Sequence, residues 1–127
     1  MAEAVVTALI PLPTFYNRDE SGERQPVEDE KFEESAGELA MLTEEGGTIH
    51  VYRDGNVRGV WWDKGVLDHD THAVIEIDFH DSPAMREALE NHIRAVLVPR
   101  FEQKAIYLKY AFPVERSLIM ERKIEVE

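Results

Sequence analysis

The residue types best suited to chemistry lie between positions 61 and 81, in the stretch WWDKGVLDHDTHAVIEIDFHD. Alternate residues of a strand share one face, so Asp68, Asp70 and His72 would align if a strand began before Asp68. One imidazole and two carboxylates form a reasonable ligand set for a divalent metal. The spacing matches no established metal motif, and a polar turn that leads into a hydrated strand is the interpretation we favour. We therefore expect neither a bound metal nor a cofactor.

A second candidate site follows from the alternation in a strand predicted over Thr71 to His80. Its apolar members point to the core, whereas Glu76 and Asp78 point to the opposite face, which other predicted strands share. The candidate ligand-binding residues on this open face are His50, Tyr52, Glu76, Asp78, Tyr107 and Lys109. An acid-base role would require burial to raise a carboxylate pKa, and the sequence supplies no segment to cover the face. The sequence identifies no catalytic residue, and an ordinary hydrated surface is the interpretation we favour for this face.

Strands and helices alternate in the segments that must position these residues. Strands are predicted over Ala4 to Leu12, Thr48 to Arg53, Thr71 to His80 and Ala105 to Val114. In the last of these we expect the inward-facing residues to be Ile106, Leu108, Tyr110 and Phe112. One helix begins near Val27 and stops at Gly46-Gly47, and another begins at Ser82-Pro83 and is kinked or ended by Pro99. An Asp54-Gly55 turn predicts that residues 56–62 return as a second strand or an extended arm.

This order predicts an α+β, two-layer, ferredoxin-like split βαβ sandwich. It has a four-stranded antiparallel sheet with a hairpin insert and two helices on one face. Right-handed crossovers place the first and third main strands in the centre and the second and fourth at the edges. We expect residues 1–127 to form a single domain, in which residues 115–127 are a possible C-terminal edge strand or arm.

The net charge of −12 is concentrated in one part of the chain. Residues 17–45 hold eleven acidic and three basic side chains, which is most of the excess. Such a surface repels phosphate backbones, so we expect no direct contact with nucleic acid. The apolar run over residues 4–12 is too short to span a membrane and has no basic residue before it. We expect a cytoplasmic protein without membrane contact.

Adjacent residues of a strand face opposite sides, so Trp61 and Trp62 cannot both enter the core. Either another segment covers the second ring, or the ring belongs to an interface with a partner. Exposed sheet edges also favour association, because pairing of edges is a common way to protect them.

Two stretches, EEGGTIHVYRDGNVRGVWWDKGVLDHDTHAVIEI and VLVPRFEQKAIYLKY, carry a family resemblance. They resemble small bacterial and phage proteins that share a Phe-rich first helix, Gly-Gly-Thr, a Gly-x-Trp arm and a closing Phe-x-Gln-x-Ala-hydrophobic-Tyr strand. The resemblance spans roughly Phe32 to Tyr110. It implies a compact α+β domain and brings no known activity with it.

We therefore expect a small non-catalytic interaction domain that acts as a homodimer or docks on another protein. One alternative is an enzyme or small-molecule-binding protein that uses the open sheet face. Another is an acidic inhibitor that imitates nucleic acid.

Overall fold

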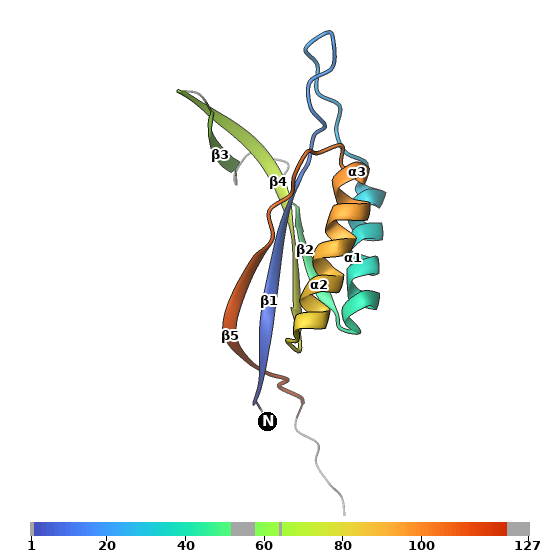
Figure 1. The fold of residues 1–127 in the computed structure, drawn as a ribbon, viewed down its shortest axis with the longest axis vertical. Helices are drawn as coiled ribbons and strands as arrows, with labels where there is room; N and C mark the ends of the chain where they lie inside the picture. Colours follow the sequence, from blue (N-terminus) through green and yellow to red (C-terminus); the bar gives the residue numbers. More distant parts are fainter. Residues whose placement is uncertain (1, 52–57, 64, 122–127) are drawn as a thin grey trace, which may run out of the picture.

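The computed structural model describes residues 2–51, 58–63 and 65–121, which form two layers (Figure 1). One layer is an antiparallel β-sheet, and the other consists of helices on one face of it. The elements in chain order are β1 (Ala2–Pro13), α1 (Asp29–Thr43), β2 (Gly47–Val51), β3 (Arg58–Asp63), β4 (Val66–Phe79), α2 (Pro83–His92), the π-helical turn η1 (Ile93–Leu97), α3 (Val98–Arg100) and β5 (Lys109–Ser117).

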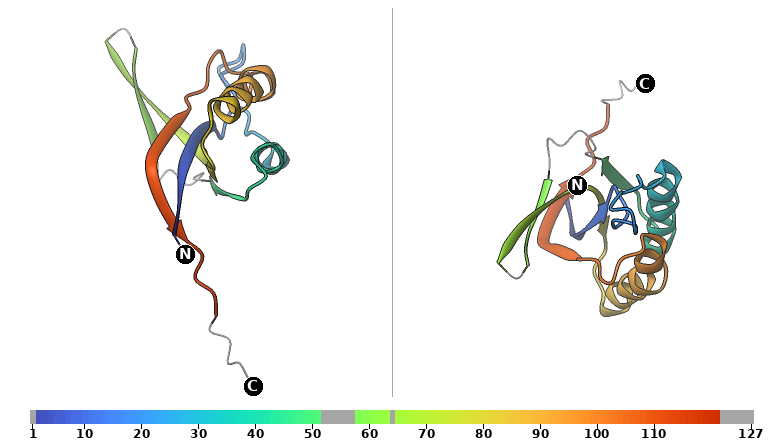
Figure 2. Two further views of the ribbon diagram at one scale, coloured as in Figure 1. Left: turned by 60° about the horizontal axis from the view of Figure 1, so that its bottom comes forward. Right: turned by 90° about the horizontal axis from the view of Figure 1, so that it is seen from above.

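The sheet has the strand order β2-β4-β1-β5. β1 and β4 are therefore central and β2 and β5 lie at the edges, as right-handed crossovers require. All the pairings are antiparallel. Figure 2 shows α1 and α2 on the same side of this sheet. The prediction of a ferredoxin-like α+β fold with two helices on one face is confirmed.

The hairpin insert differs in detail from the prediction. β3 pairs with the first half of β4, from Arg58 opposite Thr71 to Asp63 opposite Val66. β4 therefore begins at Val66, five residues earlier than predicted. The predicted turn at Asp54-Gly55 lies outside the described residues. The β3–β4 hairpin extends beyond the body of the sheet, away from the helices (Figure 1).

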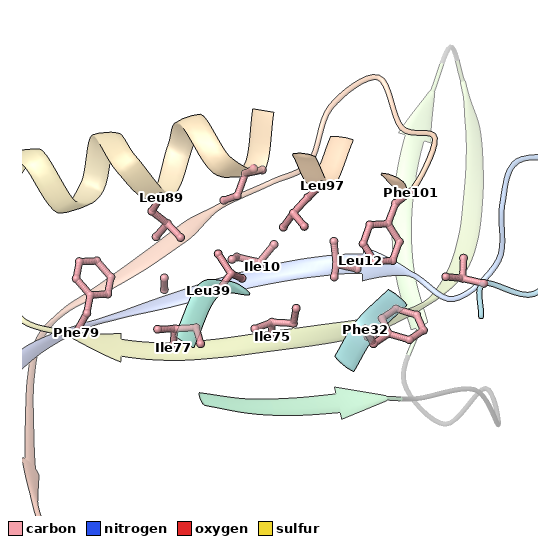
Figure 3. Close-up of a cluster of buried hydrophobic side chains, with 14 of the residues drawn as sticks. Ile10, Leu12, Phe32, Leu39, Ile75, Ile77, Phe79, Leu89, Leu97 and Phe101 are labelled. Carbon is pink, nitrogen blue, oxygen red and sulfur yellow. The ribbon is translucent and has the colours of Figure 1, made fainter. Parts of the chain in front are cut away.

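The core lies between the sheet and the helices, and its pattern follows the predicted periods of two and 3.6 residues. Alternate residues of β4 from Ala73 to Phe79 are fully buried, as are Ile10 and Leu12 of β1. The helices contribute stripes of buried side chains to the same cluster (Figure 3), namely Phe32, Leu39, Leu89, Ile93 and Leu97. Glu76 and Asp78 consequently face away from the helices.

The helix that begins at Pro83 passes through Pro99 and ends only at Arg100. A proline there lacks an N–H and crowds the carbonyl four residues earlier. The helix accommodates this by widening into the π-helical turn, in which the N–H of Val98 donates to the carbonyl of Ile93. Pro99 therefore does not end the helix, and the irregularity lies in the turn before it. Among the described helices, none combines the length and apolar character needed to cross a membrane.

The prediction for β5 was wrong at both ends. The strand begins at Lys109 instead of Ala105, and it continues to Ser117. Between Val5 and Thr7 the pairing with β5 shifts register, so that Phe112 and Pro113 both lie opposite a single residue of β1. Such a bulge breaks the alternation of side chains. Phe112, which we expected in the core, is 63% exposed.

The first residue of β2 illustrates how closely the strands approach. A β-carbon added to Gly47 would lie 2.2 Å from Ile77 Cδ1 and 2.7 Å from the backbone oxygen of Glu76. We expect Gly47→Ala to lower the free energy of unfolding by about 1–2 kcal/mol, because a backbone atom must move to make room. Urea denaturation followed by circular dichroism measures this change.

Gly46→Ala is the matched control, because a β-carbon at Gly46 would have no atom within 4 Å. An equal loss of stability in both variants would contradict the close approach at Gly47.

Candidate functional site

The sheet face away from the helices carries most of the predicted ligand-binding residues. The strand register aligns Thr48, Glu76, Leu9 and Lys109 in one row across four strands. This row follows from alternation, because the neighbours of Glu76 on β4, Ile75 and Ile77, are buried against the helices. Glu76 and Lys109 thus share the open face.

His50 and Glu76 lie side by side on this face. Their Nε2 and Oε1 atoms are 3.8 Å apart, and their side chains are 38% and 42% exposed. A general acid or base at this position would need cover that excludes water. Glu76 is open to water instead. The pair has the character of a hydrated surface contact that becomes an ion pair when His50 is protonated.

Asp78 takes part in a larger polar network near the end of β4. The hydroxyl of Thr7 donates to Asp78 Oδ1 at 2.5 Å, and Arg116 Nη1 lies 3.8 Å from Asp78 Oδ2. Arg116 also donates through Nη2 to Glu45 Oε1 at 3.1 Å, and His80 Nε2 lies 3.7 Å from the same oxygen. This network joins the end of β5 to the turn between α1 and β2.

Sequence reasoning missed Arg116 and Glu45. Arg116 lies in the segment that we interpreted as a possible edge strand or arm, and Glu45 lies in the acidic region over residues 17–45. An isolated arginine within a β-forming segment of an acidic chain is the signal that could have drawn attention to it. Its partners depend on the bulge in β5 and could not be named without the register.

The remaining predicted residues have different outcomes. Lys109 is the first residue of β5, whereas Tyr107 is an exposed residue of the segment before that strand. Tyr52 lies outside the described residues. The structure thus brings four of the predicted residues onto one sheet face, namely His50, Glu76, Asp78 and Lys109. Tyr107 lies outside β5, in the segment before it. Their role in ligand binding stays a prediction.

Asp68, Asp70 and His72 all lie within β4. The strand therefore begins before Asp68, which is the condition that we set for their alignment. The side chains of Asp68 and Asp70 are outside the described part of the chain. Where side chains are described, no three His, Asp or Glu residues are grouped closely enough to hold a metal ion. Trp62 projects from β3 with 74% of its surface exposed, and the side chain of Trp61 is not among those described.

A further surface feature follows β5. Leu118, Ile119 and Met120 are 82%, 86% and 70% exposed, and we call these three residues the apolar run. Figure 2 shows the segment after β5 leaving the sheet near the beginning of β1. Three consecutive exposed apolar residues are unusual on a folded domain without a binding role.

No family model and no curated protein sequence matches this chain. Solved structures do share its fold. The divalent cation tolerance protein CutA1 of Thermus thermophilus aligns with a TM-score of 0.55 and 13% identity over 90% of this chain and 84% of that protein. CutA1 of Oryza sativa aligns with a TM-score of 0.56 and 16% identity over 91% of this chain and 84% of its own.

CutA of Synechococcus elongatus PCC7942 has a TM-score of 0.56, with 9% identity over 92% of this chain and 84% of that one. At such identities the likeness establishes the fold alone. The resemblance to small bacterial and phage proteins stays a prediction.

Proposed function

We propose that this chain is a non-catalytic association module, which assembles with further copies of itself through the β5 side of the sheet. The exposure of the apolar run, Leu118, Ile119 and Met120, is the observation that carries the proposal. Burying each of these side chains against a partner would contribute about 1.5–3 kcal/mol. In a monomer all three remain in water.

The strand that leads into the apolar run supports the same proposal. β5 is the terminal strand in the described sheet, so one of its edges has no partner strand among the described residues. Phe112 adds a further exposed ring on this strand. An open edge next to exposed apolar side chains suits pairing with another chain, and a second copy offers the same edge in return.

The distribution of charge favours contact on this side. The acidic excess of residues 17–45 would make copies of the protein repel one another if that region were at the interface. Residues 109–120 instead contain two basic side chains, Lys109 and Arg116, and one acidic side chain, Glu115. Self-association through β5 therefore keeps the acidic surfaces apart.

Light scattering coupled to size-exclusion chromatography tests the proposal. We expect an oligomer at tens of micromolar protein, and we expect the double variant Leu118→Asp, Ile119→Asp to be monomeric. The two aspartates would place charges where the interface needs apolar contact, and burying an unpaired charge costs several kcal/mol.

Met41→Asp is the matched control, because Met41 is 81% exposed on α1, away from β5. This variant should retain the oligomer. A monomeric wild-type protein, or equal dissociation of the Met41 variant, would contradict self-association through the apolar run.

A further inference from the structure

A groove of about 350 Å³ lies between the helical segment that includes Ile93 and the segment that leads into β5, and neither the open-face residues nor the apolar run line it. Its apolar lining comes from Ile93 and Val98 on the helical side and from Ile106 and Leu108 on the segment that leads into β5. A liquid water occupies about 30 Å³, so the groove has room for about a dozen non-hydrogen atoms. This volume is within the range of small-ligand sites.

The path of the chain explains why the groove exists. After Phe101 the backbone turns at Glu102, which has a left-handed φ of 53°. Residues 103–108 then run without joining the sheet, and pairing resumes only at Lys109. The opposite wall includes part of the π-helical turn, and such turns are frequent at functional sites.

Tyr110 lines the groove, and its buried hydroxyl lacks a hydrogen-bond partner among the described residues. Tyr110 lies opposite Ala8, which is buried on the sheet face that the helices cover. Residues opposite each other in a sheet share a face, so the Tyr110 ring points inward. Burial raises the pKa of Tyr110, so the hydroxyl keeps its proton and is available as a donor. A buried donor without an acceptor is costly, and a ligand would remove this cost.

The charges around the groove favour an anion. Two cationic side chains, Arg94 and Lys104, and one carboxylate, Glu90, line it, although the whole chain carries a net charge of −12. Arg94 donates to the side-chain oxygen of Asn91. Lys104 has no carboxylate within ion-pair distance among the described residues. The ammonium group of Lys104 is thus available to a ligand.

We propose that this groove binds a small amphipathic carboxylate. Its apolar body would lie between Ile93, Val98, Ile106 and Leu108. Its carboxylate would accept a hydrogen bond from the Tyr110 hydroxyl and lie close to the Lys104 ammonium. The site requires no metal and no second copy of the chain. Binding in the groove is therefore a separate proposal from the self-association described above.

Titration with octanoate, which has ten non-hydrogen atoms, tests this site. Amide chemical shifts in proton–nitrogen correlation spectra of the full chain report both affinity and location. We expect saturable shifts confined to residues 90–98 and 104–110. Octanol and octylammonium should bind about ten-fold more weakly or worse, because they lack the carboxylate that two charge-assisted contacts select.

Three variants separate this proposal from unspecific binding. Tyr110→Phe and Lys104→Glu should each weaken octanoate binding by about ten-fold or more. Tyr110→Phe should not lower the melting temperature, because the hydroxyl that it removes has no partner among the described residues. Lys109→Glu makes the same charge change on the open face and should leave the affinity unchanged.

Several results would overturn the proposal. They are the absence of saturable shifts at millimolar octanoate, equal binding of octanol, and unchanged octanoate affinity in Tyr110→Phe and Lys104→Glu. Shifts centred on His50 and Glu76 would instead locate ligand binding on the open face and would also overturn it.

Discussion

Replacing Phe101 with alanine should lower the free energy of unfolding by about 3–5 kcal/mol, the largest loss we expect from a single substitution in this protein. Phe101 is fully buried, and its ring centroid lies 5.6 Å from that of Phe32 on α1 (Figure 3). Its truncation removes a large apolar contact and leaves a cavity between two helical segments. Chemical denaturation monitored by circular dichroism gives the difference directly.

Phe112→Ala is the matched control for this prediction. It removes the same side chain from a position that is 63% exposed in the single chain. Measured in the Leu118→Asp, Ile119→Asp background, where no interface forms, it should cost less than about 1 kcal/mol. Phe101→Leu should retain most of the stability, because it fills much of the same space. Similar losses in Phe101→Ala and Phe112→Ala would mean that Phe101 does not anchor the core.

Local patterns were sufficient to predict the central architecture. The alternation from Ala73 to Phe79 depends on one strand alone, and its alternate residues are buried as that pattern requires. Strand order then followed from the handedness of crossovers. These features need no knowledge of distant partners.

Features that depend on pairing between distant segments were not predictable in the same way. Phe112 fits the inward alternation of β5, but a bulge opposite Val6 removes it from the core. The detached segment that ends at Leu108 looks like a strand in sequence, because its residues alternate equally well. The groove owes its existence to that detachment, so the sequence could not predict it.

The candidate site residues show the same difference between features set by one strand and features set by pairing of distant segments. Alternation alone places Glu76 and Asp78 on the open face, because the face of each β4 residue depends only on its position in the strand. The contact of Arg116 with Asp78 depends on the register of β5 after its bulge. Tyr110 was correctly predicted to point inward, but a sequence pattern cannot show that its hydroxyl lacks a partner among the described residues.

Replacing Arg100 with alanine should have the second largest effect. Its guanidinium binds both carboxylate oxygens of Glu38, with Nη1–Oε1 at 2.8 Å and Nη2–Oε2 at 2.7 Å. It also donates to the hydroxyl of Ser35 on α1 at 2.9 Å, so it joins the end of α3 to α1. The side chains of Arg100 and Glu38 are 15% and 29% exposed.

Loss of this pair would leave Glu38 partly buried. Among the described residues its remaining close partner would be the imidazole of His92, whose Nε2 lies 2.9 Å from Glu38 Oε1. We expect Arg100→Ala to cost about 2–3 kcal/mol at pH 7, less than a fully buried pair because water reaches Glu38. Arg100→Lys keeps the charge but cannot make both bonds in the same plane, so an intermediate loss is expected. Equal stability of Arg100→Ala and wild type would contradict a structural role for the pair.

The same pair predicts how stability depends on pH. The hydrogen bonds from Arg100 hold the pKa of Glu38 below its usual value of 4.5, and His92 adds to the effect against the opposing influence of burial. A carboxyl whose pKa is lowered by folding stabilises the protein fully above its unfolded pKa, and this contribution disappears as the pH falls through the folded pKa. The stabilisation that wild type has over Glu38→Gln should therefore be present above about pH 5 and shrink below it. Denaturation curves for both proteins between about pH 3 and pH 7 measure this difference. A difference that did not shrink below about pH 5 would show that Glu38 does not titrate against Arg100.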